Sequence, residues 1–265
     1  GTFTATVAPV APGAGVPSGT VTFNIDGNLY CINTPLTGGV SAPCTLAGLP
    51  ALSAGVRNVV ALYNGDSCFN GSAGTLNYTV NKADTTTTIL TDVPDPSLVG
   101  QPYTVTWSVV PNPEQVNSGV PTGIVTVNGG TGGGSCSAPV GAGGCALTPT
   151  TVGIKTIQAT YSGDGNFNTS LSGTTTHTVN VQIAGVVRNG ITLSPIVGET
   201  MVLGGAGCIS ATTTTNAAGA YSFAGIFAGP CFVYPNSTYS EPFQRNYATV
   251  LANITNADFL IWANA

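Results

Sequence analysis

Charged side chains are scarce in this sequence. Only 6% of its 265 residues are Asp, Glu, Lys or Arg, against about 25% in ordinary soluble proteins. Five basic residues stand against ten acidic ones, the net charge is −5, and no basic cluster is present to neutralise phosphates. We therefore expect no nucleic-acid partner and no attraction to anionic membrane surfaces.

Long apolar runs and zinc-type cysteine spacings are also missing. No stretch approaches the roughly 18 apolar residues of a membrane-spanning helix, so we expect no membrane span. The first residues have neither the charged start nor the apolar block of a signal peptide, which predicts a processed or truncated form if the chain is exported. The seven cysteines show no CxxC or Cys/His spacing, and we expect no metal site and no cofactor.

What the sequence does contain is a regular alternation of apolar and polar residues. In the segment 103–109, Tyr103, Val105, Trp107 and Val109 alternate with Thr and Ser, which predicts a β-strand with one face in a core. The same phase recurs in the segments Phe3–Val7, Val21–Ile25, Val59–Tyr63, Leu76–Val80 and Ile157–Tyr161. Short strands separated by Gly, Pro and Asn turns are typical of β-sandwiches.

Two long stretches of the chain repeat each other. YNGDSCFNGS at 63–72 is similar to YSGDGNFNTS at 161–170, TFTATVAP to TVTWSVVP, PSGTVTF to PTGIVTV, and NYTVN to THTVN. Residues 1–82 and 83–181 therefore form two versions of one domain, and 182–265 form a third β unit. The second repeat has a further strand candidate before Tyr103. Gly1 matches Tyr103, so we expect the first domain to lack its opening strand.

These motifs resemble two known domain families. The pattern of PTGIVTV, the cysteine pair and YSGDGNFNTS resembles the bacterial immunoglobulin-like repeats of large secreted and surface proteins, over residues 1–181. TTTTNAAGAYSFAGIFAGPC is similar to a carboxypeptidase regulatory-like or prealbumin-like β-sandwich, over residues 183–265. The resemblance implies non-catalytic extracellular modules that act as spacers, stalks or adhesive parts. The predicted fold is all-β, with three tandem sandwiches.

Six cysteines fall into short-range pairs. The spacing suits neighbouring antiparallel strands, so we expect disulfides and an oxidising, extracellular compartment. The predicted pairs are Cys31 with Cys44, Cys136 with Cys145, and Cys208 with Cys231. Cys68 is left over. It is either a free or intermolecular thiol or, in the interpretation that we favour, a small hydrophobe buried beside Phe69.

Polar motifs offer weaker candidates for sites. Five N-x-S/T sequons are possible glycosylation sites, at Asn70, Asn77, Asn168, Asn236 and Asn253, and the strand phase predicts that Asn77 faces solvent. Asp66 and Asp164 occupy the repeated GD-containing loops. One carboxylate per loop is too few for calcium, so we favour turns held by Asp hydrogen bonds.

Catalysis finds no support in the sequence. His177, the only histidine, takes the place of Tyr78 of the first repeat, and no Ser or Cys with an orienting carboxylate accompanies it in a recognisable motif. We expect a packed strand residue, and no enzyme. Trp107 shares the apolar phase of its strand and is expected in the core, whereas Trp262 could stack on a sugar.

Two functional hypotheses follow. The first is an extracellular structural protein, the subunit of a cell-surface filament, sheath or stalk. Its partners would be copies of itself, joined head to tail when the incomplete first domain takes up a strand from a neighbour. The segment ADFLIWANA at 257–265, or an N-terminal extension, would be the donor. The alternative is an adhesin or a carbohydrate-binding spacer segment, with surface glycans as the partner.

Overall fold

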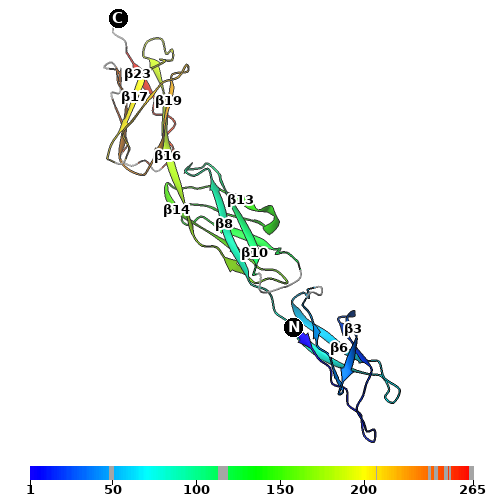
Figure 1. Cartoon of the computed structure of the whole chain (residues 1–265). Helices are drawn as coiled ribbons and strands as arrows, with labels where there is room; N and C mark the ends of the chain where they lie inside the picture. The colour runs from blue at the N-terminus through cyan, green and yellow to red at the C-terminus, as the bar shows by residue number, and fades with distance from the viewer. Residues whose placement is uncertain are drawn as a thin grey trace. The chain divides into compact units, whose positions relative to one another are not determined.

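The structure is a computed structural model of the chain. It describes residues 1–47, 51–112, 119–206, 208–237, 240–241, 244–247, 250 and 252–262. Its contacts divide the chain into two compact units. The first contains residues 1–85, 110–121 and 163–169, and the second contains residues 86–109, 122–162 and 170–265. Apart from one short 3-10 turn, the regular structure of the described residues is β-strand, which confirms the all-β fold class (Figure 1).

The first repeat is built from two antiparallel sheets. The larger has the order β4-β3-β2-β6-β7, and the smaller pairs β1 with β5. The strands are β1 (Thr2–Phe3), β2 (Thr20–Ile25), β3 (Asn28–Thr37), β4 (Val40–Ser41), β5 (Cys44–Thr45), β6 (Gly55–Tyr63) and β7 (Ser72–Val80). The core lies between the sheets and centres on Phe3, Val21, Phe23 and Val59. These residues come from the alternating positions that the sequence predicts to face inward.

The second repeat adds a strand to the smaller sheet. Here the order is β13-β10-β8, and the described residues form no counterpart of β8 beside β1. The elements are β8 (Thr85–Val93), β9 (Ser97–Leu98), β10 (Tyr103–Pro111), β11 (Ile124–Asn128), β12 (Ser135–Pro139), the 3-10 turn η1 (Val140–Ala142), β13 (Gly144–Leu147), β14 (Gly153–Tyr161), β15 (Ser170–Leu171) and β16 (Thr175–Asn189). Its core includes Trp107, as the strand phase predicts.

The last segment is a further pair of sheets. One has the order β18-β17-β20-β22, and the other places β19 and β23 on β16, with β21 beyond β23. The strands are β17 (Thr200–Gly204), β18 (Ala211–Thr214), β19 (Ala220–Ile226), β20 (Cys231–Pro235), β21 (Ser240–Glu241), β22 (Arg245–Tyr247) and β23 (Phe259–Ile261). Val187, Tyr221, Val233 and Phe259 are among its buried core residues.

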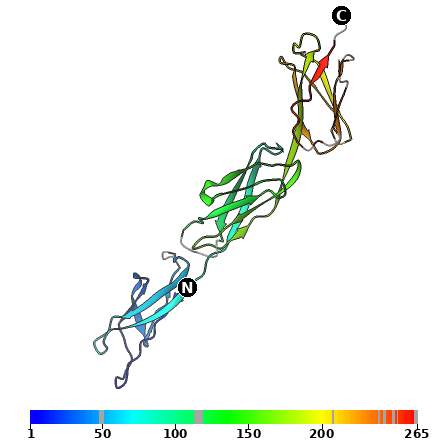
Figure 2. The ribbon, with the colours of Figure 1, turned by 180° about the vertical axis from the view of Figure 1, so that it is seen from behind.

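One strand is shared by the second repeat and the last segment. β16 pairs with β14 through Thr175–Val179, with β19 through Val181–Val186, and with β23 through Val187–Asn189. In both views of the ribbon it continues without a break (Figures 1 and 2). The boundary that we propose between 181 and 182 therefore lies inside a strand and contains no linker.

Candidate functional site

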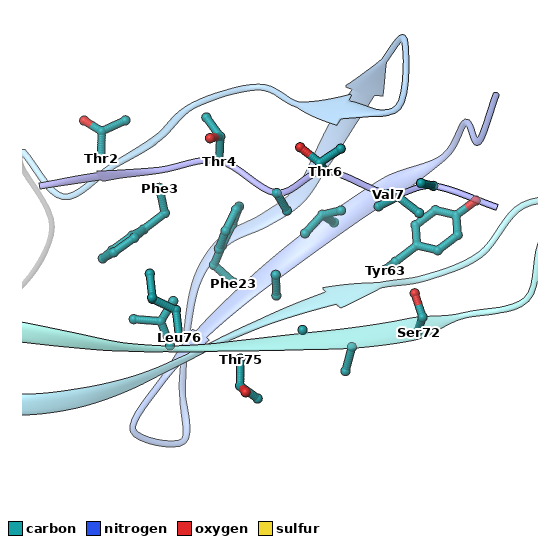
Figure 3. Close-up of a pocket in the computed structure, with 17 residues that line it drawn as sticks. Thr2, Phe3, Thr4, Thr6, Val7, Phe23, Tyr63, Ser72, Thr75 and Leu76 are labelled. Atoms are coloured by element: carbon teal, nitrogen blue, oxygen red, sulfur yellow. The ribbon is translucent and has the colours of Figure 1, made fainter. Parts of the chain in front are cut away.

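A groove opens into the core of the first repeat. It measures about 560 Å³ and lies between the β1 segment on one side and β6 and β7 on the other. The lining includes residues 2–8, Val21, Phe23, Val59, Ala61, Tyr63 and residues 72–76. Figure 3 shows the rings of Phe3, Phe23 and Tyr63 between the strand that carries Thr2, Thr4 and Thr6 and the strand that carries Leu76. The groove therefore reaches the apolar interior.

The second repeat shows what covers the corresponding edge. By the sequence match, β1 corresponds to β10, and both strands pair with the strand that carries the second cysteine of a disulfide: Phe3 opposes Cys44, and Val105 opposes Cys145. On its other side β10 pairs with β8, with the Thr91 and Thr106 hydroxyls 2.6 Å apart. The groove thus lies beside the edge that β8 covers in the second repeat.

Side-chain exposure differs accordingly between the repeats. Leu76 on β7 is 56% exposed, and Tyr78 and Val80 are half-buried. The matching His177 and Val179 on β16 are fully buried. The sequence-based expectation that Leu76 packs in the core is wrong, because no described strand covers β7 on that side. Asn77 is exposed, as the strand phase predicts.

All three cysteine pairs are joined in the structure. The Cα atoms of Cys31 and Cys44 lie 5.6 Å apart, those of Cys136 and Cys145 lie 6.0 Å apart, and those of Cys208 and Cys231 lie 5.6 Å apart. In each repeat the disulfide links a strand of the larger sheet to a strand of the smaller one. The cross-links therefore hold the two layers together at the same place in both copies.

Cys68 is exposed and unpaired, so the burial that we favoured is wrong. The turn explains why. Oδ1 of Asp66 accepts hydrogen bonds from the backbone N–H groups of Cys68 and Phe69, both at 2.8 Å. Hydrogen bonds from the Ser18 hydroxyl and backbone, followed by those from Cys68 and Phe69, hold the pKa of Asp66 well below its usual range. These contacts form the turn on which the exposed Cys68 thiol lies.

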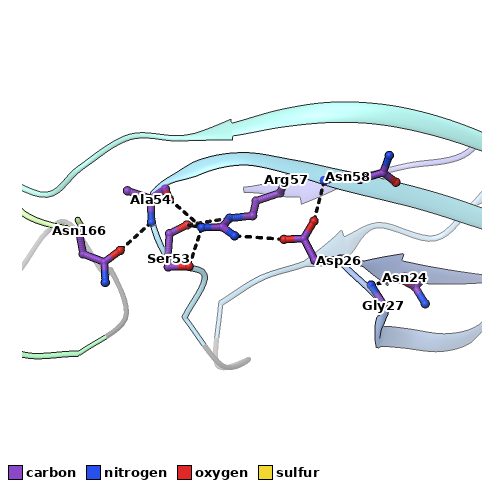
Figure 4. A network of polar contacts seen from close by, with 8 residues as sticks. All are labelled: Asn24, Asp26, Gly27, Ser53, Ala54, Arg57, Asn58 and Asn166. Carbon is purple, nitrogen blue, oxygen red and sulfur yellow. Dashed lines mark hydrogen bonds and ion pairs between the residues drawn. The ribbon is translucent and has the colours of Figure 1, made fainter.

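The matching loop of the second repeat has the same turn but a different contact. Asp164 accepts hydrogen bonds from the N–H groups of Asn166 and Phe167, which agrees with the turn interpretation of both Asp residues. Within the first unit, Oδ1 of Asn166, the counterpart of Cys68, accepts a 2.9 Å hydrogen bond from the N–H of Ala54 (Figure 4). The Asn166 carbonyl also accepts a bond from the N–H of Ala83. This loop thus binds Ala54 of the first repeat and Ala83 at the start of its own repeat.

A polar cluster surrounds His177 in the second repeat. Nε2 of the buried ring lies 2.8 Å from the Ser97 hydroxyl, Nδ1 lies 3.3 Å from Asp92 Oδ2, and the ring stacks on Tyr103 with centroids 3.7 Å apart. Burial, with a smaller effect from the Asp92 charge, raises the pKa of Tyr103 to about 12. No sequence motif joins Ser97 or Asp92 to His177, because 80 and 85 residues separate them from the histidine.

Ser97, His177 and Asp92 are linked in the same order as the residues of a catalytic triad, but the burial of Ser97 and His177 does not suit acyl transfer. A triad serine must meet a substrate carbonyl and an oxyanion site. Ser97 is 1% exposed and His177 is fully buried under the Tyr103 ring. The Ser97 hydroxyl is therefore out of reach of a substrate, and the cluster serves to pack β9 against β16.

The remaining candidate residues are not among those that line the groove. The sequon asparagines Asn70, Asn77, Asn168, Asn236 and Asn253 are all exposed. Two of these side-chain amides already donate hydrogen bonds, Asn168 to Asp84 and Asn253 to the Val99 carbonyl. Trp107 is 4% exposed, whereas Trp262 is 45% exposed.

Comparison with known sequences identifies the family. The bacterial Ig-like domain (group 3) family matches residues 1–81 and again residues 90–180. The chain belongs to this bacterial Ig-like family. The match ends before the last segment, whose prealbumin-like character stays a prediction. No curated protein matches the chain.

Solved structures similar to this Ig-like protein include two pilins and the repeats of a large adhesion protein. The T6 backbone pilin of Streptococcus pyogenes is 13% identical over 83% of this chain and 65% of its own, with a TM-score of 0.27. A tetra-tandem repeat from the extending region of a large adhesion protein is 18% identical over 95% of this chain and 70% of its own, with a TM-score of 0.39. The major pilin SpaD of Corynebacterium diphtheriae is 8% identical over 100% and 98%, with a TM-score of 0.30. The chain spans about two thirds of the T6 pilin.

None of the helices among the described residues is long and apolar enough to cross a membrane.

Proposed function

We propose that this protein is an extracellular structural module, a subunit of a cell-surface filament, sheath or stalk, and that the groove of its first repeat takes up a β-strand from a second copy of the chain. The supporting observation is the groove beside β1, at the edge that β8 covers in the second repeat. The tandem Ig-like repeats and the disulfides suit an extracellular, non-enzymatic role.

The groove offers both parts of a strand-addition site. The edge of β1 supplies backbone groups for pairing, and the pocket supplies apolar surface for alternate side chains. Burying one large apolar side chain contributes about 1.5–3 kcal/mol. β8 carries Thr87 and Ile89 at alternate positions, with Thr87 buried, so the occupant would have a similar alternation.

The donor strand that we propose is not the C-terminal segment 257–265 named from the sequence. Phe259 and Ile261 are buried, and β23 pairs in parallel with β16 and antiparallel with β21. The described part of the segment 257–265 is therefore used by its own sheet, and we propose a different strand of the second copy as the donor.

The loop that carries Cys68 supports a joint at this end of the first repeat. Its counterpart in the second repeat uses Asn166 to bind Ala54, which precedes that repeat, and Ala83, the first residue of that repeat. In the same geometry Cys68 would face a segment of the second copy at this joint, where its exposed thiol could form an intermolecular disulfide.

Electron microscopy of the native protein tests the proposal, with one variant in the groove. Leu76→Lys adds a charge to the groove at a side chain that is already 56% exposed, so it should prevent strand uptake without unfolding the repeat. Val56→Lys is the matched control, because Val56 is 64% exposed on β6 and is not part of the groove. We expect polymers from the native chain and Val56→Lys, and monomers from Leu76→Lys.

Two results would overturn strand exchange. One is equal polymer from both variants. The other is a native chain, measured by mass spectrometry, that carries about twenty further N-terminal residues which fill the groove from within, because a β8-like strand and its turn are of that length. The second result would leave the structural role intact and remove only the exchange between copies.

An adhesive or carbohydrate-binding role is the second candidate, and an aromatic pair favours it. Phe232 and Tyr234 on β20 are half-buried, with ring centroids 6.0 Å apart, and line a hollow of about 330 Å³ with Ser210 and Thr212. Aromatic faces beside hydroxyls suit sugar rings. A glycan array that binds the native chain but not Tyr234→Ala would support this role, and an array without binding would exclude it.

A further inference from the structure

We propose that Asp92, Asp95 and His177 form a binding site for a divalent transition-metal ion such as Zn²⁺. The side chains come from the end of β8, the turn that follows it, and β16. The three ligand atoms, one carboxylate oxygen from each Asp and the imidazole Nδ1, lie within 4.8 Å of one another.

The spacing suits a metal of this class. Nδ1 of His177 lies 3.3 Å from Asp92 Oδ2 and 3.6 Å from Asp95 Oδ1. Zinc binds imidazole nitrogen and carboxylate oxygen at about 2.0–2.2 Å, which in a tetrahedron separates the ligand atoms by roughly 3.3–3.6 Å. Three protein ligands leave a fourth position for water.

The surroundings orient the histidine as a ligand. Its other nitrogen, Nε2, lies 2.8 Å from the Ser97 hydroxyl, and Tyr103 stacks on the ring. A partner on the second nitrogen fixes the ring and selects the nitrogen that faces the metal. Asp95 is held in turn by the N–H of Thr178, at 2.8 Å.

The charge balance also favours a dication. The two carboxylates are both within 4 Å of the imidazole, which carries at most one positive charge. The nearest basic residue on the paired strand, Lys155 opposite His177, directs its amine to Thr151 and Val152 instead. A dication would neutralise both carboxylates, and the side chains of Asp92 and Asp95, 19% and 37% exposed, leave a path from solvent.

A calorimetric titration with ZnCl₂ after treatment with a chelator tests the site on the full chain. We expect saturation at one ion per chain. Asp95→Asn should weaken binding by about tenfold or more, because it removes a charged ligand. Asp258→Asn is the control, since Asp258 is also exposed and also accepts a backbone N–H, from Val186 at 2.9 Å. It should bind as the native chain does.

Imidazole ¹⁵N NMR gives a readout of the ligand itself. His177 is the only histidine, so the spectrum contains one ring. Zinc should shift Nδ1 strongly and Nε2 weakly. Absence of saturable binding, equal affinity in Asp95→Asn, or an unchanged Nδ1 signal on saturation would each overturn the proposal and leave the cluster as a hydrogen-bonded latch.

Discussion

The two Ig-like repeats share one sandwich topology, but different side chains fill their cores. In the second repeat β8 pairs with the edge of β10, and Tyr103 and Trp107 on β10 are buried in the core. In the first repeat the matching residues are Gly1 and Ala5, and the edge opens into a groove. Phe3 and Phe23 stand where the second repeat has Val105 and Val127, and their rings, 6.4 Å apart, fill part of the space. In the described residues of the first repeat, the edge without a strand like β8 thus coincides with the small residues Gly1 and Ala5 in the β1 segment beside it.

Removing the large residue that is special to the second repeat should have the largest effect. Trp107 is 4% exposed, and replacing a buried Trp with Ala typically costs 3–5 kcal/mol. Trp107→Ala should therefore lower the free energy of opening of β14 by about this amount. Hydrogen exchange of the β14 amides measures it, and the β6 amides of the same sample are an internal reference.

The exposed Trp262 provides the control for that experiment. Trp262→Ala, at 45% exposure, should change the exchange of β14 little. If Trp107→Ala lowered the free energy of opening of β14 by less than about 1 kcal/mol, the second repeat would not depend on this residue. The proposed difference between the cores of the two repeats would then be contradicted.

The reverse change should make the first repeat more like the second. Ala5 is half-buried and lines the groove, so Ala5→Trp should fill it. We expect the free energy of opening of β6 to rise by about 1–2 kcal/mol from added apolar burial. A synthetic peptide of residues 85–93 should bind the native chain and bind Ala5→Trp at least tenfold more weakly. Isothermal titration would measure both.

Ala42→Trp is the matched control for the groove. Ala42 is exposed and is not part of the groove lining, so this variant should bind the peptide as the native chain does. Equal binding of the peptide to Ala5→Trp, or no binding to the native chain, would mean that the groove does not accept a β8-like strand.

The sequence predicted the strands and the core better than it predicted the exposed side chains. Alternation identified Val105, Trp107 and Tyr161 as core residues, because a strand must bury one face whatever its neighbours are. The same alternation failed at Leu76, since exposure there depends on a covering strand that is far away in sequence. Cys68 was placed wrongly for a related reason: its orientation depends on the hydrogen bonds of Asp66, which a residue count does not show.

The candidate sites depended even more on folding. The repeat comparison predicted a first repeat without a strand like β8, and the groove lies beside that edge of β1. Nothing in the spacing of Asp92, Asp95 and His177 marked them as neighbours, because the β8–β9 turn meets β16 only in the folded domain. Local motifs predict turns and cross-links well, whereas clusters assembled from distant strands need the fold.

The smallest contrast concerns the two basic residues at matching positions, Arg57 and Lys155. Arg57 pairs with Asp26 at 3.2 Å near the surface, and such pairs contribute about 0.2–1 kcal/mol. Lys155 is 6% exposed, and desolvation by burial lowers its pKa from the ordinary value of 10.5. We expect Arg57→Met to lower the free energy of unfolding by up to about 1 kcal/mol. Lys155→Met should raise the free energy of unfolding by about 1 kcal/mol. This is the low end of the cost of a buried polar group, because the native Lys155 amine makes two hydrogen bonds that offset part of that cost.

The pH dependence separates this effect from simple packing. Because the pKa of Lys155 is lower in the folded state, this side chain binds more protons in the unfolded chain below pH 10.5, and its contribution to stability should rise as the pH increases toward that value. This contribution should be absent from Lys155→Met and present in Arg57→Met, so Arg57→Met should gain more stability, or lose less, than Lys155→Met between the two pH values. Denaturant unfolding at pH 7 and near pH 10 measures it, with Trp262→Phe as the background so that Trp107 is the one fluorescent tryptophan. The same pH dependence in both variants would show that the burial of Lys155 carries no penalty, and that the two basic positions are equivalent after all.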